Sequence, residues 1–276
     1  MCKIELDIVY PIHPLIKQYV DYYYILNPKQ KYLANSYIAY PNINQPVIFF
    51  DNTEVLVSGN HHHLKCNENT DFYCGVLNRF IKPLQVTITG KIKTVNIIFK
   101  STGLNSFIKA PYIDIIKNVF QNFNGLNTDA SFISDLFCLS GRQLAQSLDE
   151  MLLNNYQSFV NEHLFNAINL MSCDDSNYYG INEIEHCLKI SRKNLYRLFK
   201  THTGISPTSF RRIIRFRELL EKNKSQHLSL TQLAYNASFS DQSHFNKEVQ
   251  KLTGDKPSTF LKNAAYVNGS KLLIKQ

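Results

Sequence analysis

The sequence lacks the long apolar run that a membrane-spanning helix needs. A bilayer span takes about 20 consecutive, mostly apolar residues, and no stretch among the 276 residues approaches that length. The opening segment, MCKIELDIVYPIHP, contains an acidic residue at Glu5 and has no apolar core of the kind found in secretory signals. We therefore expect no membrane partner and a cytoplasmic location.

Cysteine is sparse and shows no metal-binding or disulfide pattern. The six cysteines are scattered along the chain, and no two of them form a C-x-x-C pair. Zinc knuckles and disulfide frameworks both need cysteines at close, regular spacings. The pattern therefore disfavours both and is typical of a protein in a reducing cytoplasm. We expect no cofactor.

The first 170 residues lack any excess of charge. The chain carries a formal net charge of +8, from 30 Lys and Arg against 22 Asp and Glu. Residues 171–276 hold 17 of the basic and nine of the acidic residues, which gives the whole excess, and residues 1–170 hold 13 of each. A generic basic surface would explain this; the alternative is that this segment alone binds an anionic partner, nucleic acid or an acidic membrane surface.

Two segments with different patterns predict an α+β protein of two domains. Residues 1–105 are rich in Val, Ile, Thr and Phe and are interrupted by Gly, Asn and Pro, as in NQPVIFFDNTEVLVSGN. Helical spacing of apolar residues follows in the rest of the chain. We assign residues 1–157 to a β-rich sensor or oligomerisation domain, residues 158–264 to an all-α domain, and residues 265–276 to a C-terminal tail.

The C-terminal segment contains an eight-residue stretch that occurs twice. TGISPTSF ends at Phe210, and TGDKPSTF ends at Phe260, 50 residues later. In each copy a Gly is placed to end one helix and a Pro to begin the next. The repeat therefore predicts two equivalent helical units.

The first unit has the pattern of a helix-turn-helix. Residues 181–188 carry an apolar face at helical spacing, and Ser191 is placed to cap a second helix that ends at Gly204. Two short helices joined by a tight turn describe this motif. The outer face of the second helix presents side chains at i, i+3, i+4 and i+7, namely Lys193, Tyr196, Arg197 and Lys200.

The second unit repeats the arrangement. Its first helix is expected around Leu230 and Ala234, and its second helix places Phe245 and Val249 inward. The outer face of that second helix carries Ser243, Asn246, Lys247 and Gln250. A helix that is capped by Ser206 is expected to join the units. Two units joined by one rigid helix fit successive turns of a DNA groove, about 34 Å apart.

These residues resemble the DNA-binding domain of AraC/XylS-type bacterial transcription regulators. The resemblance covers residues 159–264 and rests on ISRKNLYRLFKTHTGISPTSFRRIIRFRELL and LTQLAYNASFSDQSHFNKEVQKLTGDKPSTF. It implies seven helices, two helix-turn-helix units and no catalytic chemistry. The implied function is that of a sequence-specific transcription regulator, more often an activator, whose partners are double-stranded DNA and RNA polymerase.

The resemblance also implies roles for individual residues. The base-reading residues would be Lys193, Tyr196, Arg197, Gln242, Ser243, His244 and Lys247. The phosphate-contacting residues would be Ser191, Lys200 and Arg211. The chemistry suits these roles, because Arg pairs with guanine, Gln pairs with adenine and Ser bonds to either. The sequence departs from the family at Glu185, Lys189, Ser238 and Glu248, where Ala, Gly, Gly and an apolar residue are usual.

The N-terminal segment resembles the cupin-like β-barrel domains that precede some DNA-binding domains of this family. The matching stretches are AYPNINQPVIFF and VNIIFKSTGLNSFIKAPYIDIIKN, although Ser101-Thr102-Gly103 lacks the proline usual there. The resemblance implies a β-rich barrel with flanking helices, which would sense a small-molecule effector or pair two copies into a homodimer.

One motif leaves an alternative function open. HHHLKCNE places His61, His63 and Glu68 at a spacing close to that of cupin metal sites. The chain would then be a metal-dependent cupin enzyme fused to a DNA-binding domain. However, Gly59 lies too close to His61 for the cupin pattern, and the surrounding asparagines favour a solvated loop. We therefore expect a loop, no metal and no enzymatic activity.

Overall fold

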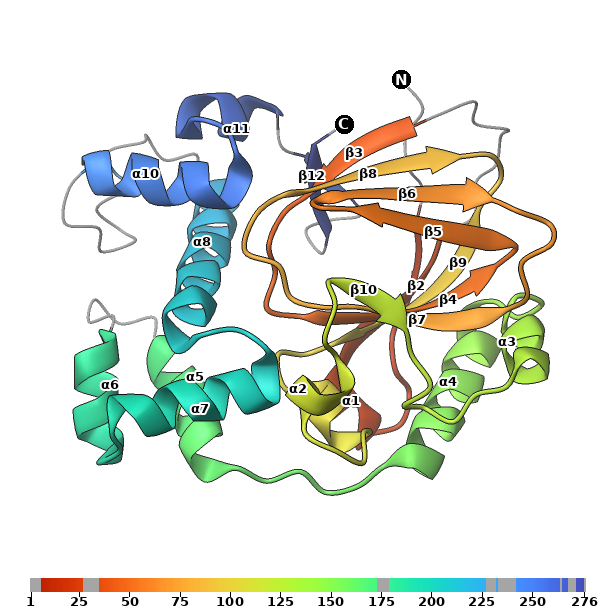
Figure 1. Ribbon diagram of the computed structural model, residues 1–276, viewed down its shortest axis with the longest axis horizontal. Helices are drawn as coiled ribbons and strands as arrows, with labels where there is room; N and C mark the ends of the chain where they lie inside the picture. Colours follow the sequence, from red (N-terminus) through yellow and green to blue (C-terminus); the bar gives the residue numbers. More distant parts are fainter. Residues whose placement is uncertain are drawn as a thin grey trace.

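The computed structural model describes residues 6–26, 35–172, 179–226, 232, 242–263, 265–267 and 272–275. The chain folds into a β-rich part and a helical part that lie side by side (Figure 1). Strands dominate the first half and helices the second, which confirms the predicted α+β class. No helix among the described residues is both long and apolar enough to cross a membrane.

The β-rich part contains two six-stranded sheets. The first sheet has the order β1 (Leu6–Val9), β2 (Val20–Leu26), β9 (Lys93–Phe99), β4 (Gln45–Asp51), β7 (Tyr73–Leu77) and β10 (Phe120–Asn122). The second has the order β11 (Ala265–Val267), β12 (Leu272–Lys275), β3 (Asn35–Ala39), β8 (Leu84–Thr89), β6 (His61–Cys66) and β5 (Thr53–Ser58). Neighbouring strands are antiparallel except for β6 and β8. The expected barrel is therefore open, since its strands divide between two sheets.

Helices cover one face of the first sheet and form a hydrophobic core with it. Val95, Ile97 and Phe99 of β9 alternate onto this face and are fully buried, as the two-residue period of a strand requires. Residues of α1 (Ile16–Tyr19), α3 (Ala130–Leu136) and α4 (Gly141–Asn155) pack against them. The buried Asp149 of α4 accepts a hydrogen bond from the Tyr23 hydroxyl at 2.6 Å, which ties α4 to the sheet.

The helical part has a second core. Its elements are α5 (Glu162–Met171), α6 (Ile181–Leu188), α7 (Arg192–Thr203), α8 (Pro207–Gln226), α10 (Gln242–Thr253) and α11 (Pro257–Asn263). Each contributes a residue that is at most 1% exposed: Leu164, Ile184, Leu195, Phe210, Phe245 and Phe260. Tyr40 of the β-rich part joins this core, and its ring meets that of Phe260 edge-on at 4.9 Å.

The histidine run forms a strand, which corrects the expectation of a solvated loop. β5 and β6 pair as a hairpin, with Ser58 opposite His61. Strand alternation places His62 inward, 4% exposed, and places His61 and His63 on the opposite face. The asparagines that favoured a loop lie in the turns before and after the strand, so they mark its ends.

The chain returns to the β-rich part after its last helix. β12 pairs with β3 (Figure 1), with Ile274 opposite Ala39. β11 pairs with β12 and completes this edge of the second sheet. The segment that the sequence analysis treated as a tail therefore links the end of the helical part to the second sheet.

Candidate nucleic-acid interface

The first helix-turn-helix unit consists of α6, a short turn and α7. Lys189 in the turn has a left-handed backbone with φ 52°, at the position where the family's glycine was noted, and this costs on the order of 1 kcal/mol. The Ser191 hydroxyl accepts a hydrogen bond from Asn194 N at 3.2 Å, which confirms the predicted N-cap. Glu185 forms an ion pair with Arg192 at 2.9 Å, so the departure from Ala is compensated across the turn.

The residues proposed to read DNA on α7 lie on its exposed face. Lys193 and Arg197 are exposed, and Tyr196 is an exposed aromatic at 49%. Leu195 and Phe199 on the opposite face are fully buried, as the helical period predicted. Lys200 is half-buried, and its ammonium donates to Gly204 O at 3.2 Å. The structure therefore brings three of the four outer residues into solvent and places the fourth at the C-terminal end.

The repeated octapeptide forms the same helix ending twice. Gly204 and Gly254 both have φ 78° and follow the last residues of α7 and α10, and a left-handed residue at this position is a common way to end a helix. The hydroxyl of Thr203 donates to Phe199 O at 2.7 Å, and that of Thr253 donates to Val249 O at 2.8 Å. The sequence repeat is thus a structural repeat, down to its hydrogen bonds.

The linking helix α8 begins where the sequence predicted. Ser206 caps it by accepting a hydrogen bond from Ser209 N at 3.1 Å. Phe210, Ile213 and Ile214 are buried against the neighbouring helices. With 20 residues, α8 is about 30 Å long at 1.5 Å per residue. One rigid element therefore connects the two units.

The second unit is described through α10. Its proposed base-reading residues are all exposed: Gln242, Ser243, His244 and Lys247. Phe245 and Val249 are buried on the opposite face, as predicted. Apart from Gln232, the first helix and the turn of this unit, expected between Leu230 and Asp241 and including Ser238, lie outside the described residues.

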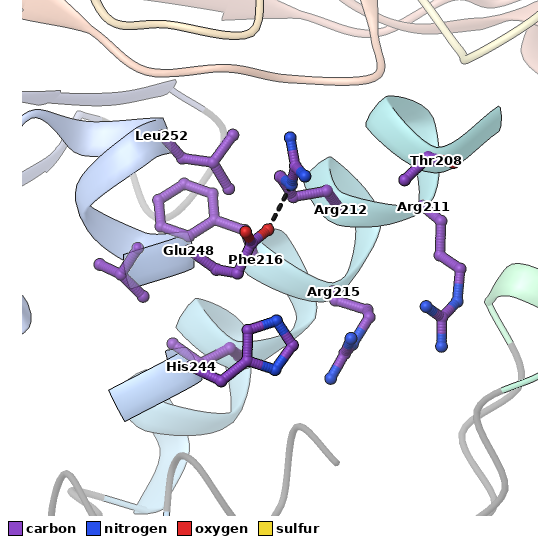
Figure 2. Close-up of a pocket in the computed structure, with 10 residues that line it drawn as sticks. Thr208, Arg211, Arg212, Arg215, Phe216, His244, Glu248 and Leu252 are labelled. Carbon is purple, nitrogen blue, oxygen red and sulfur yellow. Dashed lines mark ion pairs between the residues drawn. The ribbon is translucent and has the colours of Figure 1, made fainter. Parts of the chain in front are cut away.

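Glu248 of α10 forms ion pairs with one residue of α8 and one of its own helix. Its carboxylate pairs with Arg212 of α8 (Figure 2) and with Lys251 Nζ at 2.9 Å. Burial by itself would raise the pKa of Glu248, but the hydrogen bond from Lys251 and the charge of Arg212 outweigh it and hold the pKa below its usual value. A charge at an expected apolar position was the sequence signal; its partner could not be identified from the sequence.

A cavity of about 240 Å³ lies beside this ion pair, between α8 and α10. His244 and Arg211, proposed from the sequence as DNA contacts, both line it, together with Arg215 (Figure 2). These side chains therefore gather in the angle between the linking helix and α10. Arg211 of α8 and His244 of α10 therefore line one cavity, with Arg215 between them (Figure 2).

The contacts between the β-rich part and the end of α7 were not expected from the sequence. Arg79, in the loop between β7 and β8, is 7% exposed and donates to Thr203 O at 3.0 Å and to Ile43 O at 2.8 Å. Asn105 donates to His202 O at 3.0 Å. The last carbonyls of a helix lack intrahelical donors and carry partial negative charge, so these contacts both satisfy and stabilise the end of α7.

The histidines of β6 have hydrogen-bond partners on the neighbouring strand. His61 Nε2 lies 2.9 Å from Thr87 Oγ1, and His63 Nε2 lies 2.8 Å from Thr89 Oγ1. Glu68 follows the end of β6, in the next turn. Within the described ranges, no three His, Cys, Asp or Glu side chains are grouped so that they could hold a metal ion.

The helical part matches a known family, and the chain is similar to two curated proteins. Residues 185–263 match the family described as a helix-turn-helix domain. The chain is 29% identical over 83 residues to the raffinose operon transcriptional regulatory protein RafR of Pediococcus pentosaceus, which is 30% of each chain. It is 24% identical over 199 residues to histidine kinase P4 of Formosa agariphila, which is 68% of this chain and 13% of that protein. The chain thus spans less than a third of either relative.

Solved structures of ToxT from Vibrio cholerae are also similar. ToxT of strain O395 is 16% identical, and the match covers 94% of this chain and 96% of that chain with a TM-score of 0.44. An apo form of ToxT is 14% identical, and the match covers 87% of this chain and 96% of that chain with a TM-score of 0.46.

Proposed function

We propose that this chain, whose C-terminal region is an AraC-type helix-turn-helix domain, is a sequence-specific DNA-binding transcription regulator. The observation that supports the proposal best is the duplicated unit. α7 and α10 end in the same way, are joined by α8, and present exposed polar and basic faces. Recognition helices of this kind enter the major groove of DNA.

The two recognition helices, α7 and α10, would enter successive segments of one major groove. The roughly 30 Å length of α8 is comparable with the 34–36 Å between major-groove segments one turn apart. On α7, the guanidinium of Arg197 would bond two acceptors of a guanine edge, and Lys193 and Tyr196 would contact bases beside it. On α10, Gln242, Ser243, His244 and Lys247 would contact the second segment.

The remaining contacts would be electrostatic. Ser191 and Arg211 would bind phosphates, and the +8 net charge supports a polyanionic partner through counterion release. We propose that the protein is a non-enzymatic activator in the cytoplasm and works with RNA polymerase. Its β-rich part would bind a small-molecule effector or pair two copies.

The proposal is tested by separating base reading from backbone contact on α7. Arg197→Ala is expected to weaken binding to the preferred site by roughly 1–3 kcal/mol and to relax preference at one or two base pairs. Lys200→Ala is expected to weaken binding to all sequences alike and to lower the salt slope by about one, because Lys200 lies at the end of the helix. The measurement is binding of the full-length protein to a randomised duplex library at about 50 and 200 mM salt.

Wild-type protein without salt-dependent binding to any duplex would contradict the proposed function. Arg197→Ala protein with unchanged base preference, together with altered preference in Lys200→Ala, would place the wrong face of α7 in the groove. Arg142→Ala is a suitable control, since Arg142 is exposed on α4 of the β-rich part.

A further inference from the structure

The loop between β7 and β8, residues 78–83, lies between the C-terminal ends of the two recognition helices. At one end of the loop, Asn78 Oδ1 would lie 3.1 Å from a Cβ atom placed on Gly204, which follows α7. At the other end, Pro83 Cγ would lie 3.6 Å from a Cβ atom placed on Gly254, which follows α10. One short loop of the β-rich part therefore reaches both helix-turn-helix units.

This loop is held firmly in place. Arg79 bonds to Thr203 O of α7 and to Ile43 O of the β-rich part, and its guanidinium lies 5.3 Å from the centre of the Tyr112 ring. The Tyr112 hydroxyl in turn donates to Asn78 Oδ1 at 2.7 Å. Because these groups connect the loop to both parts of the molecule, the position of the loop relative to α7 is fixed.

A basic cleft of about 450 Å³ opens between the loop and α7. Arg79 and Lys82 line it from the loop, and Tyr196 and Lys200 line it from α7. Ser206 adds the N-terminal end of α8 to the wall, where helix N–H groups favour negative charge. None of the described residues that line the cleft is acidic. The charged residues that line the cleft are therefore all basic, the rest of its wall is polar or apolar, and Lys82 is the exposed cation on its β-rich side.

We propose that Lys82 of the β-rich part contacts the DNA backbone beside Lys200, so that the DNA-binding surface extends beyond the helical part. The proposal rests on the proposed function and adds a partner contact to it. Tyr196 and Lys200 are one helical turn apart on the face assigned to the groove, so a DNA strand that flanks α7 passes the mouth of the cleft. Lys82 is exposed there, between the two recognition helices, where the backbone crosses from one major-groove segment to the next.

The experiment compares Lys82→Gln with Lys91→Gln in the full-length protein. Both lysines are exposed on the β-rich part, but Lys91 follows the far end of β8, and the six residues of this strand span about 20 Å. Binding to a selected site and to an unrelated duplex is measured between about 50 and 200 mM salt. Lys82→Gln is expected to lower affinity for both duplexes about 3- to 10-fold and to reduce the salt slope by about one. Lys91→Gln should leave both quantities unchanged.

Three results are distinguishable. Wild-type affinity and salt slope in Lys82→Gln, with wild-type protein binding DNA normally, would overturn the inference and leave the proposed function intact. Wild-type protein that binds no duplex would overturn both. The third result comes from adding inorganic phosphate. If phosphate raised the thermal unfolding midpoint of the wild-type protein but not of Lys82→Gln, and the variant still bound DNA normally, the cleft would be a site for a free anion. The inference would then be wrong.

Discussion

The two recognition helices end alike but are supported differently. α7 and α10 are each 12 residues long and end at a glycine with φ 78°. The end of α7 is held by the β-rich part, through Arg79 and Asn105. α10 is held by the linking helix, through the ion pair between Glu248 and Arg212. The repeated residues therefore give both helices the same length and the same C-terminal ending. The residues that hold each helix against the rest of the molecule are not part of the repeat.

The two units also differ in how they contact the β-rich part. The first unit is attached to the β-rich part, so a change in that part reaches α7 directly. The second unit is attached to α8, which also contacts the β-rich part: Arg217 of α8 donates to Pro41 O at 2.7 Å and to Tyr40 O at 2.9 Å. Phe260 of α11 meets the Tyr40 ring as well. The β-rich part therefore contacts α7 directly and reaches α10 through α8.

The largest expected effect comes from removing the support of α7. Arg79→Leu would leave the buried carbonyl of Thr203 and the partly buried carbonyls of Ile43 and Ser101 without their donor. A buried acceptor left unsatisfied costs about 1–3 kcal/mol. We expect a loss of about 3–5 kcal/mol in the free energy of unfolding, measured by urea denaturation. Hydrogen exchange should show faster opening of α7 than of α10. Equal loosening of both helices would remove the proposed difference between them.

An intermediate effect is expected at the support of α10. Glu248→Gln removes an ion pair whose carboxylate is only 11% exposed, and we expect a loss of about 2–3 kcal/mol at pH 7. Hydrogen exchange should now report faster opening of α10, with α7 unchanged. Glu150→Gln, at an exposed position on α4, provides the control.

The same pair predicts a pH dependence. The folded-state pKa of Glu248 is held below its usual value of 4.5 because the Lys251 hydrogen bond and the Arg212 charge outweigh the effect of burial. The contribution to stability is therefore present above pH 4.5 and is lost as the pH falls through the lower, folded-state pKa. Glu248→Gln should not show this acid-dependent component, which a series of urea denaturations from pH 7 to pH 3 would reveal.

The smallest expected effect compares the two glycines. Alanine at either position costs about 1 kcal/mol, because both have left-handed backbones. At Gly204 the new Cβ would also lie 2.9 Å from Tyr112 Cε1, whereas at Gly254 its nearest neighbour, Pro83 Cγ, would lie at 3.6 Å, an ordinary contact. We expect Gly204→Ala to cost about 2 kcal/mol in total and Gly254→Ala about 1 kcal/mol. Equal losses would contradict the close packing of α7 on the β-rich part.

The features that depend on nearby residues could be predicted from the sequence. The N-cap at Ser191, the start of α8 after Ser206 and the glycine endings all involve residues at most four apart. The inward positions Phe199 and Phe245 followed from the helical period. These features define the two units and the faces that they expose.

The features that join distant segments could not be predicted. Arg79 and Thr203 are 124 residues apart, and an arginine in a loop has no pattern that identifies its partner. The pairing of β12 with β3 joins segments that are more than 200 residues apart in the same way, with Ile274 opposite Ala39. The strand of His61 and His63 was missed because the asparagines that mark its ends outweighed its two-residue alternation.

The most direct measurement is a hydroxyl-radical footprint of the full-length protein on its preferred site. Two helix-turn-helix units joined by α8 should protect two segments about 10 base pairs apart on one face of the duplex. Arg197→Ala should weaken protection in one segment and Lys247→Ala in the other, because these residues occupy equivalent positions on α7 and α10. A single protected segment, or a loss in the same segment for both variants, would contradict binding by two equivalent units.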